Sequence, residues 1–444
     1  MPSGLARLTA RLRAQWSERR TVRRVTANSL WLAADNLFRL ALAFVVGAWV
    51  TRHLGPAKLG TLSAAVAFSA PFMAIVSLGI NGLVVRDLTR EPENEGAILG
   101  TALALKLTGA ALGITLGASV AFVARGADLV FLMIVLTLAG SLFQATEVVD
   151  LWFQGRGISR VPAWIRSVAA IAVNLVKVGL ILVEAPLPFF AATTGLELAF
   201  CALGWSLAYV RRSAQELRWS FRASYAKRLL AQTWPVACAG IAVQIQAQFD
   251  QVLLARLRSA EEVGYYVAAL RMVTIWSFLP TALATAAAPE VARAWGAEPG
   301  LFERRMRDLY RAVLVVGVAS SGLVALFATE LVALVFGARF ADSAAILPML
   351  GVRLVLTNLG VARGLFITNE GLFVHAMWTA VAGAAVNLGL NLLLIPGWGT
   401  AGCVAASLVS FTFTTLLLDL LHPGARRNLG TIAAALGLRR LEGR

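Results

Sequence analysis

Residues 97–123 read AILGTALALKLTGAALGITLGASVAFV and contain one charged side chain, Lys106. A bilayer core about 30 Å thick needs about 20 helical residues to cross it. The stretch is therefore long enough and apolar enough to span a membrane as a helix. Similar apolar runs recur along the whole chain and are separated by short polar breaks. The sequence predicts a polytopic helical membrane protein.

The composition agrees, because 58% of the 444 residues are hydrophobic and 14% are charged, whereas about a quarter of an average globular protein is charged. This composition excludes a disordered chain and disfavours a soluble enzyme. We expect an all-α fold of about 12 transmembrane helices in two pseudo-symmetric six-helix lobes. The predicted spans are 28–50, 60–84, 97–123, 128–152, 162–184, 187–210, 234–254, 262–288, 306–329, 341–366, 371–394 and 399–421.

The distribution of Lys and Arg predicts the orientation. An even number of spans places both termini on one side, and the loops of that side hold 29 of the 40 basic residues, against 6 on the other side. Cytoplasmic loops carry the excess of Lys and Arg in membrane proteins. We therefore expect both termini to be cytoplasmic. The net charge of +16 belongs to these loops, so no nucleic-acid partner is expected.

The predicted spans divide the chain into five parts. Residues 1–27 hold seven arginines and no apolar segment, which indicates a basic amphipathic helix on an anionic membrane face. An Arg-rich start is also typical of a mitochondrial transit peptide, but the first span follows directly. The further parts are an N-terminal lobe (28–210), a basic linker (211–233), a C-terminal lobe (234–421) and a cytoplasmic tail (422–444).

An internal repeat relates the two predicted lobes. Thr51–Val66 (TRHLGPAKLGTLSAAV) matches Ala255–Leu270 (ARLRSAEEVGYYVAAL) at an offset of 204, so that Gly60 corresponds to Gly264. Chance similarity between Leu- and Ala-rich helices is the alternative. Two halves with the same topology enclose a central cleft when they pack side by side.

The chain resembles the polysaccharide-biosynthesis, O-antigen (Wzx-type) flippases of the MATE-like multidrug/oligosaccharidyl-lipid/polysaccharide (MOP) exporter superfamily. Three stretches carry the resemblance: RHLGP at 52–56, EVGYYVAA at 262–269 and NLGLNLLLIP at 387–396. The resemblance implies two lobes in a V around a central cavity. It also implies movement of undecaprenyl-diphosphate-linked oligosaccharides (O-antigen, capsule or exopolysaccharide repeats) to the outer leaflet by alternating access. The expected location is a bacterial or archaeal cytoplasmic membrane.

Five basic residues fall inside predicted spans, where a charge costs about 2.5–3.5 kcal/mol at the bilayer centre. They must face a wet cavity or pair with acids. A cationic cavity would bind the diphosphate of such a cargo, because phosphate groups take several charge-assisted hydrogen bonds. Pairing is the structural alternative, and Asp35 lies one turn before Arg39. The five candidates for the cavity are Arg39, Lys106, Lys177, Arg271 and Arg353.

Uncharged and acidic groups complete the predicted site. Gln244, Gln248 and Gln251 share one helix face, which favours a polar cavity wall, with helix–helix hydrogen bonding as the alternative. Asp35, Glu197 and Asp250 are candidates for ion coupling or for pairing with the buried cations.

Two other functional classes stay open. An ion-coupled small-molecule (multidrug) antiporter of the same superfamily would need a titrating carboxylate in an acidic cavity. A membrane glycosyltransferase or ligase would need convergent catalytic groups, and the sequence contains no P-loop or cluster of metal-ligand spacing. We expect no catalytic residues, no metal and no cofactor. The expected partners are the lipid bilayer, a polyprenyl-diphosphate-linked glycan and, as a further candidate, polysaccharide polymerase machinery.

Overall fold

The computed structural model describes residues 4–158, 160–212, 219–296, 298 and 300–438, with side chains from residue 36 onward. The side chains of the predicted amphipathic segment 1–27, and that of Asp35, lie outside this description. Every regular element in the described part of the chain is helical.

The elements follow one another with short connections. The first half contains α1 (Gly4–Ser77), α2 (Asn81–Arg90), η1 (Pro92–Asn94), α3 (Glu95–Arg125), α4 (Leu129–Ala139), α5 (Ser141–Gln144), α6 (Glu147–Gly155), α7 (Arg160–Leu182) and α8 (Leu187–Arg212). The second half contains α9 (Ala223–Leu257), α10 (Ala260–Thr274), η2 (Ile275–Ser277), α11 (Phe278–Ala294), α12 (Leu301–Leu326), α13 (Ala328–Val335), η3 (Ala338–Phe340), α14 (Ser343–Glu370), α15 (Phe373–Thr412), η4 (Phe413–Leu417), η5 (Leu418–Leu420) and α16 (Pro423–Ala435).

Two of the longest helices are broken at glycines. Gly55 in α1 has φ +71° and Gly399 in α15 has φ +54°, in the left-handed region that glycine adopts at no steric cost. Each break reverses the chain and separates two spans. In the described part, nine helical segments are long and apolar enough to cross a membrane, and the two that contain these breaks have 55 and 48 residues. Each of these two segments counts as two spans, which gives eleven, and α9 (35 residues) is the twelfth. The prediction of about 12 spans is confirmed.

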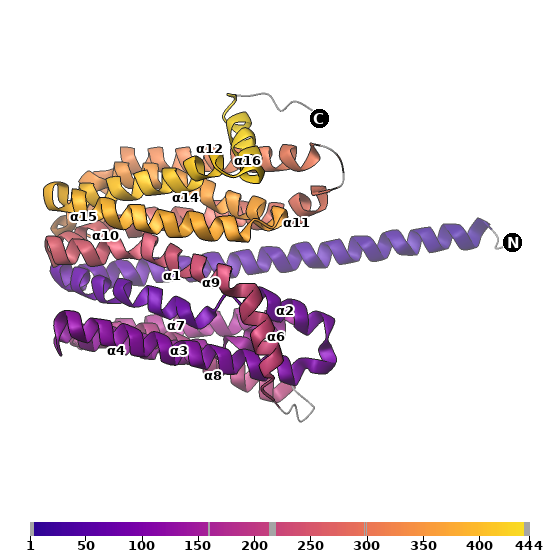
Figure 1. Ribbon diagram of the computed structural model, residues 1–444, viewed down its shortest axis with the longest axis horizontal. Helices are drawn as coiled ribbons and strands as arrows, with labels where there is room; N and C mark the ends of the chain where they lie inside the picture. The colour runs from indigo at the N-terminus through magenta and orange to yellow at the C-terminus, as the bar shows by residue number, and fades with distance from the viewer. Residues whose placement is uncertain (1–3, 159, 213–218, 297, 299, 439–444) are drawn as a thin grey trace.

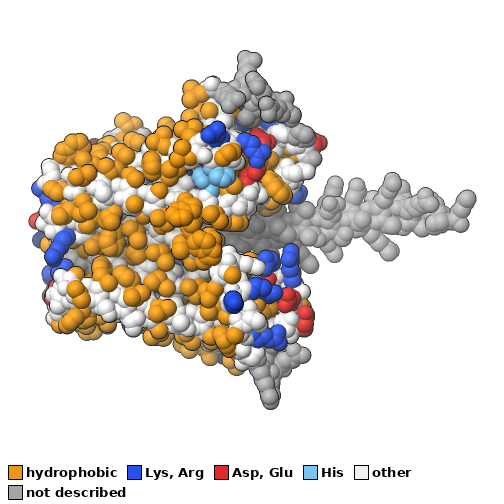
Figure 2. Space-filling view, in the orientation of Figure 1, with side chains coloured by type: hydrophobic (Ala, Val, Ile, Leu, Met, Phe, Trp, Pro, Cys, Tyr) orange, Lys and Arg blue, Asp and Glu red, His pale blue; other side chains and the backbone are white. Residues whose placement is uncertain are grey.

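The helices form two lobes (Figure 1). One lobe contains α1 to α8 and the other contains α9 to α16, and α1, α9 and α10 lie where the two lobes meet. The helix α1 packs against α3, α4 and α7 of the first lobe and also against α9 and α10. Charged side chains gather toward the two ends of the bundle, and the surface between is largely hydrophobic (Figure 2). This distribution is the one that a bilayer requires.

The two ends of the bundle differ in their packing. We call the end where α1 projects the terminal end, and the opposite one, where α3 meets α4 and α9 meets α10, the distal end. At the distal end one hydrophobic core joins both lobes and contains Leu59, Tyr266 and Leu350. At the terminal end Trp152 and Phe366 belong to separate cores, one in each lobe. Among the described residues the lobes are thus most tightly joined at the distal end.

The internal repeat forms a close contact between the lobes. A Cβ atom on Gly60 would lie 1.6 Å from the carbonyl oxygen of Ala260, and one on Gly264 would lie 2.1 Å from that of Pro56. Both contacts join positions that the offset of 204 relates, so the surface is self-complementary, as at a two-fold axis. Arg52 adds hydrogen bonds from α1 to the carbonyl oxygens of Leu334 and Val335 in α13.

Part of the predicted linker 211–233 is structured. The helix α9 begins at Ala223, ahead of the predicted span start at 234. The amide of Ser220 donates to the carbonyl oxygen of Gly96 (3.1 Å), and the Tyr225 hydroxyl donates to Asp87 Oδ2 (3.1 Å). The start of α9 is therefore bound to the terminal end of the first lobe.

Candidate functional site

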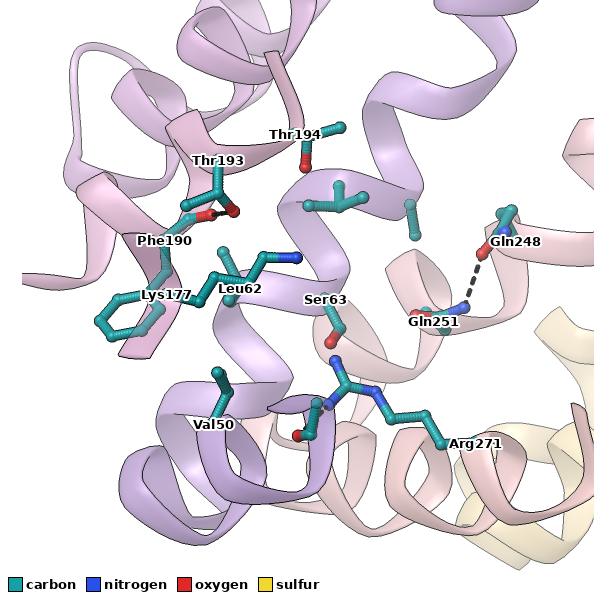
Figure 3. Close-up of a pocket in the computed structure, with 13 residues that line it drawn as sticks. Val50, Leu62, Ser63, Lys177, Phe190, Thr193, Thr194, Gln248, Gln251 and Arg271 are labelled. Carbon is teal, nitrogen blue, oxygen red and sulfur yellow. Dashed lines mark hydrogen bonds between the residues drawn. The ribbon is translucent and has the colours of Figure 1, made fainter. Parts of the chain in front are cut away.

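A cavity of about 220 Å³ lies between the lobes and is lined by residues of α1, α7, α8, α9 and α10 (Figure 3). Lys177 of α7 and Arg271 of α10 point into it from opposite lobes. Gln248 and Gln251 of α9 line the same space, and the Gln251 amide donates to Gln248 Oε1 at 2.8 Å. The fold thus brings together four residues that the sequence predicts for one cavity.

Among the described residues, the guanidinium of Arg271 is bound to neutral oxygens only. Its Nη1 donates to the carbonyl oxygen of Gly47 (3.0 Å) and to Thr51 Oγ1 (2.6 Å), both on α1. Within the described part of the chain, no carboxylate oxygen lies within 4.0 Å of Arg271 or of Lys177 Nζ. The cavity therefore holds two positive charges without bound counter-charges, a state that costs free energy in low dielectric and favours an anionic ligand.

A second cavity, of about 440 Å³, lies nearer the terminal end and shares Thr194 with the first. Arg39, Gln244 and Glu197 line it, together with Arg166. Arg39 Nη2 donates to Asn36 Oδ1 at 3.1 Å. The predicted glutamine face does point between the lobes, but Gln244 lines this cavity and not the one that holds Gln248 and Gln251.

Lys106 lies elsewhere, in contrast to its predicted place in the cavity. Its side chain is fully buried inside the first lobe, and its Nζ lies 2.6 Å from Glu147 Oε2 on α6. Asn81 donates a further hydrogen bond to Glu147 (3.3 Å). The pairing alternative therefore describes Lys106. Helix spacing could not identify this partner, because Glu147 lies 41 residues after Lys106 in the chain.

Arg353 and Asp250 also lie away from both cavities, in contrast to the predicted place of Arg353 in the cavity, whereas pairing with a buried cation is one of the two predictions for Asp250. They are buried in the second lobe around the Tyr266 hydroxyl, which accepts from Arg353 Nη1 (2.7 Å) and donates to Asp250 Oδ2. Arg353 Nη1 lies 3.8 Å from the same carboxylate oxygen, and its guanidinium lies over the ring of Phe411 (5.4 Å). The network connects α9, α10 and α14, which indicates a structural pair.

Sequence reasoning missed two residues at the cavities. Thr51, which accepts from the guanidinium of Arg271, stands out in the sequence only as part of the repeat, and Arg166 falls within the predicted span 162–184 but is not among the five predicted cations. Arg166 Nη1 lies 2.8 Å from Asp150 Oδ2, so this cation at the second cavity is paired. A helix-face analysis of α7 would have grouped Arg166 with Lys177, which lies three turns further on.

Apolar helices of membrane-spanning length, arranged in two lobes around a polar interlobe cavity, define a multi-pass membrane protein. The solved structures with this fold include an inward-facing multidrug resistance MATE family transporter (TM-score 0.69, 17% identity, 91% of this chain and 96% of that chain). They also include the lipid II flippase MurJ in an inward closed conformation (TM-score 0.69, 14% identity, 92% and 91%). At these low sequence identities, the structural similarity shows a common fold.

The chain belongs to the polysaccharide biosynthesis protein family, whose model matches residues 25–295. A curated relative is the probable low-salt glycan biosynthesis flippase Agl15 of Haloferax volcanii, 24% identical over 402 residues, which cover 88% of this chain and 82% of the relative. The resemblance inferred from the sequence motifs is confirmed.

Proposed function

We propose that the protein flips a polyprenyl-diphosphate-linked oligosaccharide repeat unit across the cytoplasmic membrane by alternating access. Membership of the polysaccharide biosynthesis family and similarity to a glycan biosynthesis flippase support the cargo class. In this proposal the protein is a transporter and not an enzyme, and the glycan is handed to polymerase machinery on the far side.

The observation that carries the proposal is the pair of cations, Lys177 and Arg271, in one interlobe cavity without carboxylate partners among the described residues. A diphosphate offers several anionic oxygens, which accept charge-assisted hydrogen bonds. Arg presents a planar fork of donors to such a group and Lys a compact charge. Because one cation comes from each lobe, a bound diphosphate would contact both lobes at once.

We further propose that the terminal end faces the cytoplasm. The excess of Lys and Arg in the loops of that end supports this orientation. The single core at the distal end then closes the outer side, and the second cavity, with Arg39 and Gln244, lies on the entry side. The lipid chain stays in the bilayer while the headgroup passes between the lobes.

The test replaces each cavity cation with Gln in the full-length protein. We expect Lys177→Gln and Arg271→Gln each to lower polymer export at least tenfold, since each removes a charge-assisted contact worth roughly 1.5–3 kcal/mol. Lipid-linked repeat units should then accumulate in the inner leaflet. Lys58→Gln and Arg256→Gln are matched controls, because both side chains are exposed near the distal end. Normal export by the Lys177→Gln/Arg271→Gln double variant would refute the diphosphate site.

The small-molecule antiporter keeps one supporting observation, the carboxylate of Glu197 in the second cavity. That function predicts that Glu197→Gln abolishes ion-driven efflux of cationic dyes from vesicles that contain the protein. A wild-type protein that moves no such dye under either a proton or a sodium gradient would exclude it.

A further inference from the structure

Arg271 connects the two lobes across the cavity. It belongs to α10, and both of its hydrogen-bond partners, Gly47 and Thr51, belong to the first span of α1. The Thr51 hydroxyl donates its own hydrogen to the Gly47 carbonyl oxygen at 2.7 Å. Its oxygen lone pairs are thereby turned toward the guanidinium, where they accept from Nη1.

Only one corner of the guanidinium is used in this way. The group has five N–H donors, and the two bonds to α1 both come from Nη1. Arg271 lines the cavity, and Figure 3 shows its guanidinium beside Ser63, with Lys177 extending into the cavity from the other side. The contact with α1 therefore orients the cation while Nη2 and Nε stay available to a ligand in the cavity.

The same contact lies beside the closed distal end. Thr51 precedes Arg52, which bonds to α13. The crossing of Gly60 with Gly264 involves the same two helices: Gly60 follows the break at Gly55 in α1, and Gly264 precedes Arg271 in α10. A state open at the distal end must separate α1 from α10, and this separation breaks the bonds from Arg271 to Thr51 and Gly47. In the empty transporter, no residue in the described part of the cavity offers that guanidinium a carboxylate in place of these two oxygens.

We propose that Thr51 is a positioning residue that holds Arg271 and keeps the empty transporter closed at its distal end, and that the cargo diphosphate replaces it as the acceptor. This inference rests on the proposed function. Phosphate oxygens carry charge, and hydrogen bonds to them are about twice as strong as those to a hydroxyl or a carbonyl. Bound cargo thus satisfies Arg271 without α1, and the lobes separate at the distal end only when the cavity is loaded.

The experiment measures opening from the distal side. Ala67→Cys serves as the reporter because its side chain lines the cavity and is 2% exposed in the closed state. Vesicles that contain the full-length protein are treated with a membrane-impermeant maleimide, with and without undecaprenyl diphosphate, and labelling is quantified on the peptide that contains residue 67. Ala102→Cys, in the core of the first lobe and 0% exposed, controls for unfolding.

In the protein that carries Ala67→Cys, we expect undecaprenyl diphosphate to raise the labelling rate of residue 67 about tenfold. Thr51→Val should raise labelling without lipid about tenfold, because one hydrogen bond to a charged group is lost, and the lipid should then add less than twofold. Thr51→Ser keeps the hydroxyl and should behave like the parent. Thr51→Ala, which also lacks the hydroxyl, replaces Thr51→Val if that variant does not insert.

Unchanged basal labelling of Thr51→Val, with a full response to the lipid, would overturn the role of Thr51. Binding of undecaprenyl diphosphate separates this failure from failure of the proposed function. If Lys177→Gln and Arg271→Gln weaken binding while Thr51→Val opens like the parent, only the positioning role is wrong. If the two Gln variants bind the lipid normally, the diphosphate site itself is wrong.

Discussion

At the scale of single residues, the buried charges divide into two kinds by their partners. Asp250 and Arg353 satisfy each other through Tyr266 inside the second lobe, whereas Arg271 contacts neutral oxygens of the opposite lobe. Removing one member of a buried ion pair leaves the other without a counter-charge and costs about 3–5 kcal/mol. We predict that Asp250→Asn lowers the stability of the detergent-solubilised protein by that amount, measured by thermal unfolding. The Asp250→Asn/Arg353→Met double variant should recover most of the loss and should export polymer. If Arg353→Met has normal stability but exports no polymer, Arg353 binds the cargo and is not a structural partner of Asp250.

The sequence predicts which residue types lie in the membrane but not which of them are paired. Lys106 and Arg271 look alike in sequence, since neither has an acid within one turn. Their difference arises from tertiary contacts: Glu147 reaches Lys106 from another helix, and among the described residues no carboxylate reaches Arg271. Arg39 donates a hydrogen bond to Asn36 on its own helix and also lines a cavity. Helix spacing alone therefore cannot decide between a structural and a cargo-binding role for Arg39.

At the scale of elements, α16 shows how a helix outside the predicted spans is held. Asp419, which is fully buried, accepts two hydrogen bonds from Arg363 (2.9 and 2.6 Å) and one from Asn428 of α16 (3.2 Å). We predict that Asp419→Asn releases α16 and makes the chain sensitive to trypsin at Arg426. Glu370→Gln is the matched control: Glu370 also binds α16, through Arg427, but that side chain is 56% exposed. Exposed ion pairs contribute about 0–1 kcal/mol, so the control should resist trypsin like the parent. Equal sensitivity of the two variants would contradict the anchoring role of Asp419.

The fold of the whole molecule could largely be predicted, because both the spans and the repeat can be recognised in short stretches of the sequence. Apolar runs of membrane-spanning length give the helices, and the offset between Gly60 and Gly264 gives the two lobes. The break at Gly55 falls between two predicted spans, and the break at Gly399 falls on the first residue of the predicted span 399–421. The start of α9 was not predicted, because residues 219–233 are polar and charged and become ordered through contacts with the first lobe, such as that of Tyr225 with Asp87.

The repeat also makes a prediction about the transport cycle, because closure of the distal end depends on two glycines that face backbone. A methyl group on Gly60 would overlap the carbonyl oxygen of Ala260, and backbone cannot move aside as a side-chain end can. Overpacking of this kind costs about 1–3 kcal/mol, and here the cost applies only to the closed state. Gly60→Ala should therefore shift the lobes toward opening at the distal end, raise labelling of Ala67→Cys about tenfold and lower export. Gly264→Ala should act in the same way, and the double variant should show less than the sum, since both changes break one contact. Gly179→Ala on α7 is the control, since nothing lies within 4 Å of the added methyl group. If Gly60→Ala stays as inaccessible as the parent and exports normally, the crossing of α1 and α10 is not the closure that the cycle must open.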